Sequence, residues 1–195
     1  LFEHINLDKD KFILSAGWKA AMLYYHLWRK GRVTEEELNS YCQPGSKWIG
    51  LSEPIHPDIP FAGGSMGMGL PAAVGFALSK KLKKEEGRVY VLMSDGELQC
   101  GTTWESMLIA NQHRLGNLLT IIVDANGLQA MGRTKDILKC WFPIEQHQVC
   151  VAVNGHDYEA LESCIEIPYD LSGEIEHIYP RIILAYTTKG KGVSF

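Results

Sequence analysis

Two apolar runs with the character of β-strands, separated by a segment long enough for one helix, most constrain how this chain can fold. Residues 88–93 read Arg-Val-Tyr-Val-Leu-Met, and residues 118–123 read Leu-Leu-Thr-Ile-Ile-Val. Short apolar runs of this kind are typical of strands in the interior of a sheet. A strand, a helix and a second strand of this length form a right-handed crossover between parallel strands. We therefore predict a parallel sheet in which these two strands are joined by one helix.

A polar group follows each of the two strands. Asp95 lies just after the first strand, and Asn126 lies just after the second. Ligands of open α/β sheets bind at the carboxyl ends of the strands, and carboxylate and amide oxygens suit Mg²⁺ or Ca²⁺ carrying a phosphate. The pattern predicts a metal–diphosphate site that Asp95 and Asn126 share. Two other interpretations stay open, since Asp95 can be a turn or cap residue and Asn126 can belong to an Asn-Gly turn.

The segment between the two strands carries a helix-start signal. Residues Thr102 to Glu105 have the Thr-x-x-Glu form of a capping box, which predicts that the helix begins there. Gly116-Asn117 ends the segment before the second strand. The amino end of this helix is then expected close to Asp95, with backbone N–H groups free to meet phosphate oxygens.

The rest of the chain continues the alternation of helices and strands. Helices are predicted at residues 17–29, from the capping box at Thr34, from Leu70, and from Asp157 to about Ile165, and strands at residues 149–153 and 181–186. Residues 41–63, rich in Pro, Gly and Ser, predict a long loop. We expect a single domain over residues 1–195, an α/β fold with an open, mostly parallel sheet and helices on both faces.

The composition limits the kinds of molecule that the chain is expected to bind and the compartment in which it is expected. The chain is 46% hydrophobic and 22% charged with a net charge of −4, which predicts no general attraction to nucleic acid or to an anionic membrane. No apolar run reaches the roughly 18 residues of a membrane span, and no secretory signal is seen. The five cysteines include no Cys-x-x-Cys, so we expect free thiols in a reducing cytoplasm. Leu1 is not an initiator methionine, so upstream sequence is expected to have been removed.

Several segments together resemble the transketolase family. Ser94-Asp95-Gly96, followed about thirty residues later by Asn126, is similar to that family's thiamine diphosphate motif. Further similar segments are Gly96-Glu97-Leu98-Gln99, Trp104-Glu105, Asn126-Gly127-Leu128-Gln129, the glycine-rich loop Gly63 to Gly69, Phe12 to Ser15, Asn154 to Asp157, and Thr188 to Phe195. The resemblance covers nearly the whole chain in the expected order, and it is to the first half of transketolases.

The resemblance implies a set of site residues. Thiamine diphosphate and Mg²⁺ (or Ca²⁺) are the implied cofactors, with metal ligands from the side chains of Asp95 and Asn126 and the carbonyl of Leu128. Cofactor contacts are implied for Gly64, Ser65, Met66, Gly96, Glu97 and Asn126. His56 aligns with a family His near cofactor and substrate, which makes it the candidate catalytic residue. The alternatives are a glycine loop that serves tight packing and a His56 that is a solvated loop residue.

Four positions depart from the family pattern. Trp18 stands where the family has a His that contacts the diphosphate, and an indole cannot carry a proton as an imidazole does. Cys100 stands in place of a Glu that couples paired active sites, Ser94 in place of the first Gly of the motif, and Met68 in place of a Gln. Trp18 and Cys100 motivate a second hypothesis, a relative that binds cofactor or partner without turnover.

The resemblance also implies a partner. In this family the cofactor is activated by a glutamate of a second, pyrimidine-binding half, and none of that half is found here. We expect the diphosphate-binding subunit or a fragment of a split transketolase, acting with a pyrimidine-binding subunit in a homo- or hetero-oligomer. The implied reaction moves a two-carbon ketol unit between sugar phosphates. An unrelated metal-dependent phosphate enzyme on a doubly wound sheet is the third hypothesis.

Overall fold

The computed structural model describes residues 1–116, 118–127, 132–133, 136–137, 150–166 and 180–193. A five-stranded sheet in the order β1-β2-β3-β5-β4 forms its centre, and all four strand pairings are parallel. The strands are β1 (Lys11–Leu14), β2 (Val89–Ser94), β3 (Leu119–Ala125), β4 (Cys150–Asn154) and β5 (Arg181–Tyr186). Strands β2 and β3 correspond to the two apolar runs of the sequence and are direct parallel neighbours, as predicted.

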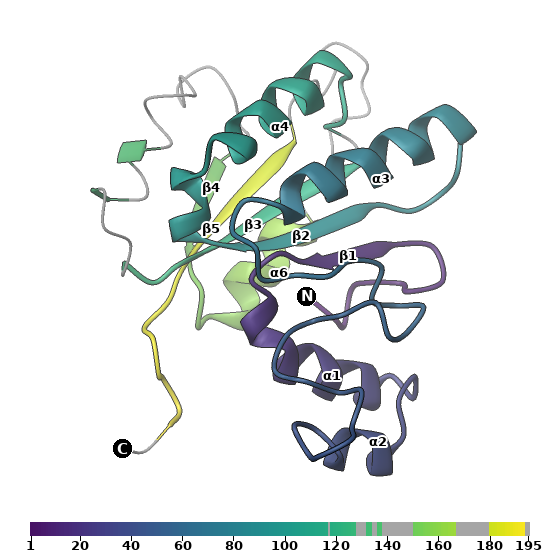
Figure 1. Cartoon of the computed structure of the whole chain (residues 1–195). Helices are drawn as coiled ribbons and strands as arrows, with labels where there is room; N and C mark the ends of the chain where they lie inside the picture. Colours follow the sequence, from purple (N-terminus) through teal and green to yellow (C-terminus); the bar gives the residue numbers. More distant parts are fainter. Residues whose placement is uncertain (117, 128–131, 134–135, 138–149, 167–179, 194–195) are drawn as a thin grey trace.

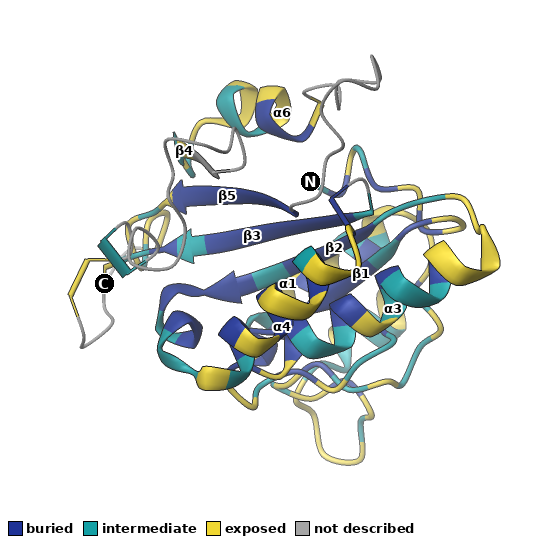
Figure 2. Ribbon diagram, turned by 90° about the horizontal axis from the view of Figure 1, so that it is seen from above, coloured by how far each residue is buried: buried dark blue, intermediate teal, exposed yellow. Residues whose placement is uncertain are grey.

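Helices cover both faces of the sheet, which confirms the predicted fold class (Figure 1). They are η1 (Gly17–Lys19), α1 (Ala20–Arg29), α2 (Glu35–Asn39), α3 (Gly69–Lys83), η2 (Asp95–Gln99), α4 (Gly101–Gln112) and α6 (Tyr158–Glu166). Helices α3 and α4 pack with Val91 and Ile121 in one core, and α1 and α6 pack with Tyr90 and Ile122 in the other. Neighbouring residues of one strand thus serve opposite cores, so β2, β3 and β5 are buried along most of their length (Figure 2).

Strand β1 was not predicted. Its run Phe12-Ile13-Leu14 is too short to distinguish a strand from a buried turn by periodicity alone. In the structure β1 pairs with β2, and Ile13 is fully buried against the α3 side of the sheet. The strand matters for the site because the chain leaves it at Ser15 and turns directly into η1.

The predicted capping box at Thr102 is wrong. Helix α4 begins one residue earlier, at Gly101, and no side chain caps it; the Thr102 hydroxyl instead donates to the Gly67 carbonyl (2.9 Å). The capping carboxylate of this region is Glu97, which accepts from the Ser94 backbone N–H (2.8 Å) within η2. Asp95 is thus the first residue of a short 3₁₀ helix that lies between β2 and the amino end of α4.

Two other helix starts agree with the sequence. The Thr34 hydroxyl accepts from the Glu37 N–H (3.1 Å) while the Glu37 carboxylate accepts from the Thr34 N–H (3.1 Å), which is the predicted capping box of α2. Asp157 accepts from the Ala160 N–H (3.1 Å) at the start of α6. Across the described part of the chain, none of the helices has the length and apolar character that a membrane crossing demands.

Candidate functional site

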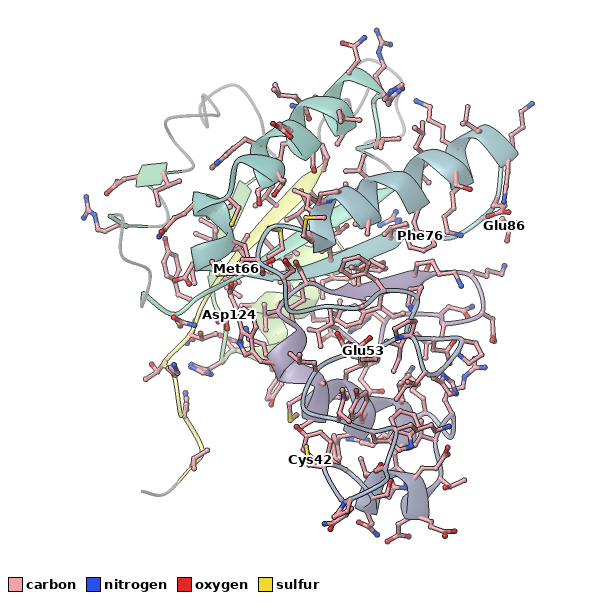
Figure 3. All side chains as sticks on the ribbon, viewed as in Figure 1. Cys42, Glu53, Met66, Phe76, Glu86 and Asp124 are labelled. Carbon is pink, nitrogen blue, oxygen red and sulfur yellow. The ribbon has the colours of Figure 1, made fainter. Side chains whose placement is uncertain are left out.

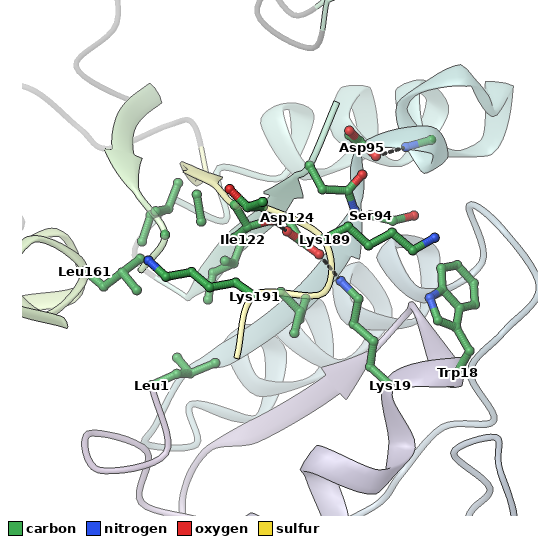
Figure 4. Close-up of a pocket in the computed structure, with 18 of the residues that line it drawn as sticks. Leu1, Trp18, Lys19, Ser94, Asp95, Ile122, Asp124, Leu161, Lys189 and Lys191 are labelled. Atoms are coloured by element: carbon green, nitrogen blue, oxygen red, sulfur yellow. Dashed lines mark hydrogen bonds and ion pairs between the residues drawn. The ribbon is translucent and has the colours of Figure 1, made fainter. Parts of the chain in front are cut away.

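A cavity of about 790 Å³ opens at the carboxyl ends of β2, β3 and β5 (Figure 4). Met66 and Asp124 lie in this region, while Glu86 lies toward the other end of the sheet (Figure 3). The polar and charged groups around the cavity come from η1, from the ends of β2 and β3, and from the segment after β5: Lys19, Ser94, Asp95, Asp124, Asn126, Thr187, Thr188, Lys189 and Lys191. The predicted edge of the sheet is thus the edge that carries a cavity.

Asp95 is held between two loops. Its side chain is nearly buried, with Oδ1 accepting from the Gly96 N–H and Oδ2 accepting from the Gly127 N–H, each at 2.9 Å. The second bond ties the end of β2 directly to the Asn126-Gly127 turn after β3. An ionised carboxylate offers about four lone-pair sites, so both oxygens retain acceptor capacity. The backbone N–H of Gly96, a residue for which the resemblance implies a cofactor contact, donates to Asp95 in this structure.

Asn126 lines the same cavity as Asp95 and lies two residues after Asp124, which lines the cavity as well. The third predicted ligand, Leu128, lies outside the described residues. A carboxylate and a carboxamide from adjacent parallel strands therefore face one space. Oxygen donors of this kind fit a hard divalent cation.

Asp124 was not predicted as a site residue, yet its carboxylate accepts hydrogen bonds from side chains of two distant segments. The Lys19 ammonium forms an ion pair with it, and the Thr187 hydroxyl donates to its other oxygen. Burial by itself would raise the pKa of Asp124, but the hydrogen bonds from Lys19 and Thr187 outweigh burial and hold that pKa below its ordinary value. The sequence held no signal for Lys19, because the pair joins residues that the fold alone brings together.

Glu97, predicted as a cofactor contact, does not line the cavity. Its carboxylate is fully buried and accepts from the Gly67 N–H (3.1 Å), the Ser94 N–H (2.8 Å) and the Ser15 hydroxyl. Ser15 in turn accepts from the Gly69 N–H (3.1 Å). The side chain thus fastens the glycine loop to the ends of β1 and β2, and only the backbone of Glu97 is left for the predicted contact.

The glycine loop serves close packing at three of its positions. A Cβ on Gly63 would lie 2.2 Å from the Leu14 carbonyl oxygen, one on Gly69 would lie 2.2 Å from the Ser15 Cβ, and one on Gly67 would lie 2.5 Å from the Cys100 Cβ. The packing interpretation that the sequence left open therefore holds for these glycines. Of the three predicted cofactor contacts here, Met66 lines the cavity, whereas Gly64 and Ser65 are not among its lining residues.

His56 is not brought to the cavity. Its Nε2 lies 3.1 Å from the Arg32 carbonyl oxygen, and its Nδ1 accepts from the Asp58 N–H (3.2 Å). One ring nitrogen is thus engaged by the turn between α1 and α2 and the other by the loop that follows α2, and the catalytic role of His56 stays a prediction.

Three residues that sequence analysis left unassigned lie at the cavity. Trp18, at the family's His position, is 47% exposed there. Lys189 and Lys191 extend over the cavity, Lys189 on the side of Trp18 and Lys191 on the side of Leu161 (Figure 4). Because Lys19 is already paired with Asp124, Lys189 and Lys191 are the ammonium groups on this wall that suit an anionic ligand.

Residues 3–194 match the family model described as the thiamine diphosphate binding domain of transketolase. This chain belongs to the transketolase family. It is 36% identical to one subunit of the apulose-4-phosphate transketolase of Actinobacillus succinogenes, over 98% of this chain and 68% of that protein. It is 31% identical to the subunit of the same name in Phocaeicola vulgatus, over 96% of this chain and 66% of that protein.

Solved transketolases share the fold. A Pichia stipitis transketolase mutant in complex with fructose 6-phosphate is 27% identical and superposes with a TM-score of 0.77, over 95% of this chain and 29% of that one. The chain thus corresponds to less than a third of a single-chain transketolase and to about two thirds of the separate subunits. The predicted family, its amino-terminal diphosphate-binding half and the transferase class are confirmed.

Proposed function

We propose that this chain is the diphosphate-binding subunit, or part of that subunit, of a split transketolase that uses thiamine diphosphate and a divalent cation. The observation that carries the proposal is that Asp95 and Asn126 line one cavity at the ends of adjacent parallel strands. The separate transketolase subunits among its relatives support the split arrangement. Mg²⁺, the smaller of the two candidate cations, suits a site with few protein ligands and a phosphate-bearing partner.

The residues of this chain have separate tasks in the proposed site. Asp95 and Asn126 would hold the cation, with the Leu128 carbonyl as the further ligand that the resemblance implies. The ammonium groups of Lys189 and Lys191 would offset the negative charge of the diphosphate or of a sugar phosphate at the cavity mouth. Thiamine diphosphate, when bound, supplies the electron sink that carries a two-carbon unit. The walls of the cavity are mostly apolar, from Leu92, Ile122 and Ile183, and would exclude water from that unit.

The proposed partner is a pyrimidine-binding transketolase subunit, and the proposed substrates are a ketose phosphate donor and an aldose phosphate acceptor. We propose the cytoplasm as its location because the five cysteines include no Cys-x-x-Cys and fit free thiols in a reducing compartment.

Reconstitution tests the proposal. The chain is mixed with a pyrimidine-binding subunit from the same source, thiamine diphosphate, Mg²⁺ and a sugar-phosphate pair, and ketose and aldehyde products are quantified. We expect product only when both subunits and both cofactors are present. A complex that assembles, binds thiamine diphosphate and forms no product with any sugar-phosphate pair would support the non-catalytic hypothesis instead.

A further inference from the structure

We propose that Asp124, held by Lys19 and Thr187, is a positioning residue that orients the Asn126 carboxamide toward the divalent cation. This inference rests on the proposed function, because it concerns how the cation site is built. Asp124 lies near the end of the middle strand of the sheet, where it is in register with Ser94 of β2 and Ala185 of β5. It is thus within reach of the loops that follow β1, β3 and β5.

Side chains from each of those loops line the cavity together with Asp124. Lys19 arrives from η1, directly after β1, and is joined to Asp124 in Figure 4. Thr187 arrives from the segment after β5. Asn126 lies two residues after Asp124, just past the end of β3, and lines the same cavity. Lys19 and Asp124 keep only 25% and 18% of their side-chain surface exposed, so the ion pair is largely shielded from water. A partly buried pair is screened much less by salt than a surface pair.

A hydrogen bond between the side chains of Asn126 and Asp124 can form in only one orientation. An ionised carboxylate only accepts hydrogen bonds, and in a carboxamide only the NH₂ group donates. A hydrogen bond from Asn126 to Asp124, two residues before it in the same cavity wall, therefore uses the nitrogen of Asn126 and directs the carboxamide oxygen elsewhere. That oxygen is the atom of Asn126 suited to bind a hard cation. Groups that orient a metal ligand in this way typically change metal affinity by about 10–100-fold when they are removed.

For Lys19, simple electrostatics and the proposed positioning role predict opposite effects on cation binding. By Coulomb's law alone, removing a positive charge near a cation site strengthens cation binding. If Lys19 fixes Asp124, and Asp124 fixes Asn126, then Lys19→Met weakens cation binding despite removing a positive charge. Lys189→Met is the matched control, since it removes the same charge from the same cavity while leaving the Lys19–Asp124 ion pair in place.

The experiment titrates Mg²⁺ at saturating thiamine diphosphate and records the rise in melting temperature of the full chain. We expect Asp124→Leu to raise the half-saturating Mg²⁺ concentration about 10–100-fold. Lys19→Met and Thr187→Val should raise it by smaller factors. Lys189→Met should weaken binding of thiamine diphosphate itself but, once that cofactor is saturating, should leave the Mg²⁺ midpoint unchanged or lower it. If Asp124→Leu does not fold, Lys19→Met and Thr187→Val carry the test, and the melting temperature without ligand reports folding.

The outcomes separate this inference from the proposed function. If the parent chain shows no Mg²⁺-dependent stabilisation, both fail. If the parent responds and Asp95→Ala removes the response, but Lys19→Met and Thr187→Val behave as the parent or bind Mg²⁺ more tightly, the positioning role alone is overturned. Weaker cofactor binding by Lys19→Met at an unchanged Mg²⁺ midpoint would likewise overturn it, in favour of direct contact between Lys19 and the diphosphate.

Discussion

At the residue scale, the site depends on carboxylates that bind backbone N–H groups from more than one loop. Asp95 joins the ends of β2 and β3 through Gly96 and Gly127. Glu97 joins the glycine loop to β1 and β2. The two residues are neighbours in one 3₁₀ turn, yet Asp95 lines the cavity and Glu97 does not. Their substitutions should therefore have different consequences.

Asp95→Ala should abolish the stabilisation that thiamine diphosphate and Mg²⁺ confer. A ligand stabilises the folded state by an amount set by its affinity, about 2.7 kcal/mol at a concentration of 100 times Kd. The measurement is the difference in melting temperature with and without ligand, so that any loss from the freed Gly127 N–H cancels. An equal ligand-induced rise in the parent and in Asp95→Ala would remove Asp95 from the site.

Glu97→Ala should lower the free energy of unfolding by about 2–4 kcal/mol, because it leaves several buried donors without an acceptor. Glu97→Gln should lower the free energy of unfolding by less. The glutamine amide oxygen can still accept hydrogen bonds, whereas its NH₂ group faces one donor with which it cannot bond. Urea unfolding of parent and variants gives the comparison. A loss below about 1 kcal/mol for Glu97→Ala would contradict the role of Glu97 in fastening the glycine loop to the ends of β1 and β2.

At the scale of elements, the loop before α3 and the helix itself place very different demands on glycine. Gly63 is buried in the loop, where an added Cβ would lie 2.2 Å from the Leu14 carbonyl oxygen of β1. Gly75 is exposed within α3, and nothing lies within 4 Å of an added Cβ there. We expect Gly63→Ala to lower the free energy of unfolding by about 2–3 kcal/mol through overpacking. Gly75→Ala should raise it by about 0.5–1 kcal/mol through helix propensity, and equal effects of the two in urea unfolding would contradict the packing account.

Helix α1 carries a buried phenol that should make stability fall at high pH. Tyr24 is fully buried, and its hydroxyl donates to the Leu51 carbonyl (2.8 Å). Burial, and to a lesser extent nearby Tyr41, raises the pKa of Tyr24 to about 12 from an ordinary value of 10.0. The unfolded chain therefore releases this proton at lower pH than the folded chain does, and its stabilising contribution is complete below pH 10 and is lost as the pH rises toward 12.

Tyr24→Phe isolates this contribution. Urea unfolding of both proteins between pH 9 and pH 12 should show a steeper loss of stability for the parent, because the variant lacks the ionising group. At neutral pH the variant should be less stable by about 1 kcal/mol, the value of one hydrogen bond. Parallel pH profiles for the two proteins would show that Tyr24 does not titrate in this window.

At the scale of the whole molecule, the sequence predicted what depends on local pattern and missed what depends on distant contacts. Strands β2 and β3 and their parallel pairing followed from two apolar runs and the segment between them, and Asp95 and Asn126 followed from their positions at the strand ends. Strand β1 was missed because its short run becomes a strand only by pairing with β2. The start of α4 was misplaced because the Thr102 hydroxyl bonds to the glycine loop instead of its own helix.

The difference between local pattern and distant contact also explains which site residues were predicted and which were not. Lys19 and Thr187 were not predicted because their link to Asp124 is spatial, across long stretches of chain. Glu97 was assigned to the cofactor from its place in a motif, whereas its side chain turns into the protein. A motif places a residue near a site, but the direction of its side chain depends on the loops that surround it.

The buried Glu97 network has a consequence for ligand affinity. Because one carboxylate already fastens the glycine loop to the ends of β1 and β2, that wall of the cavity is ordered before any ligand arrives. Less loop entropy is then lost on binding, so more of the contact energy is retained as affinity.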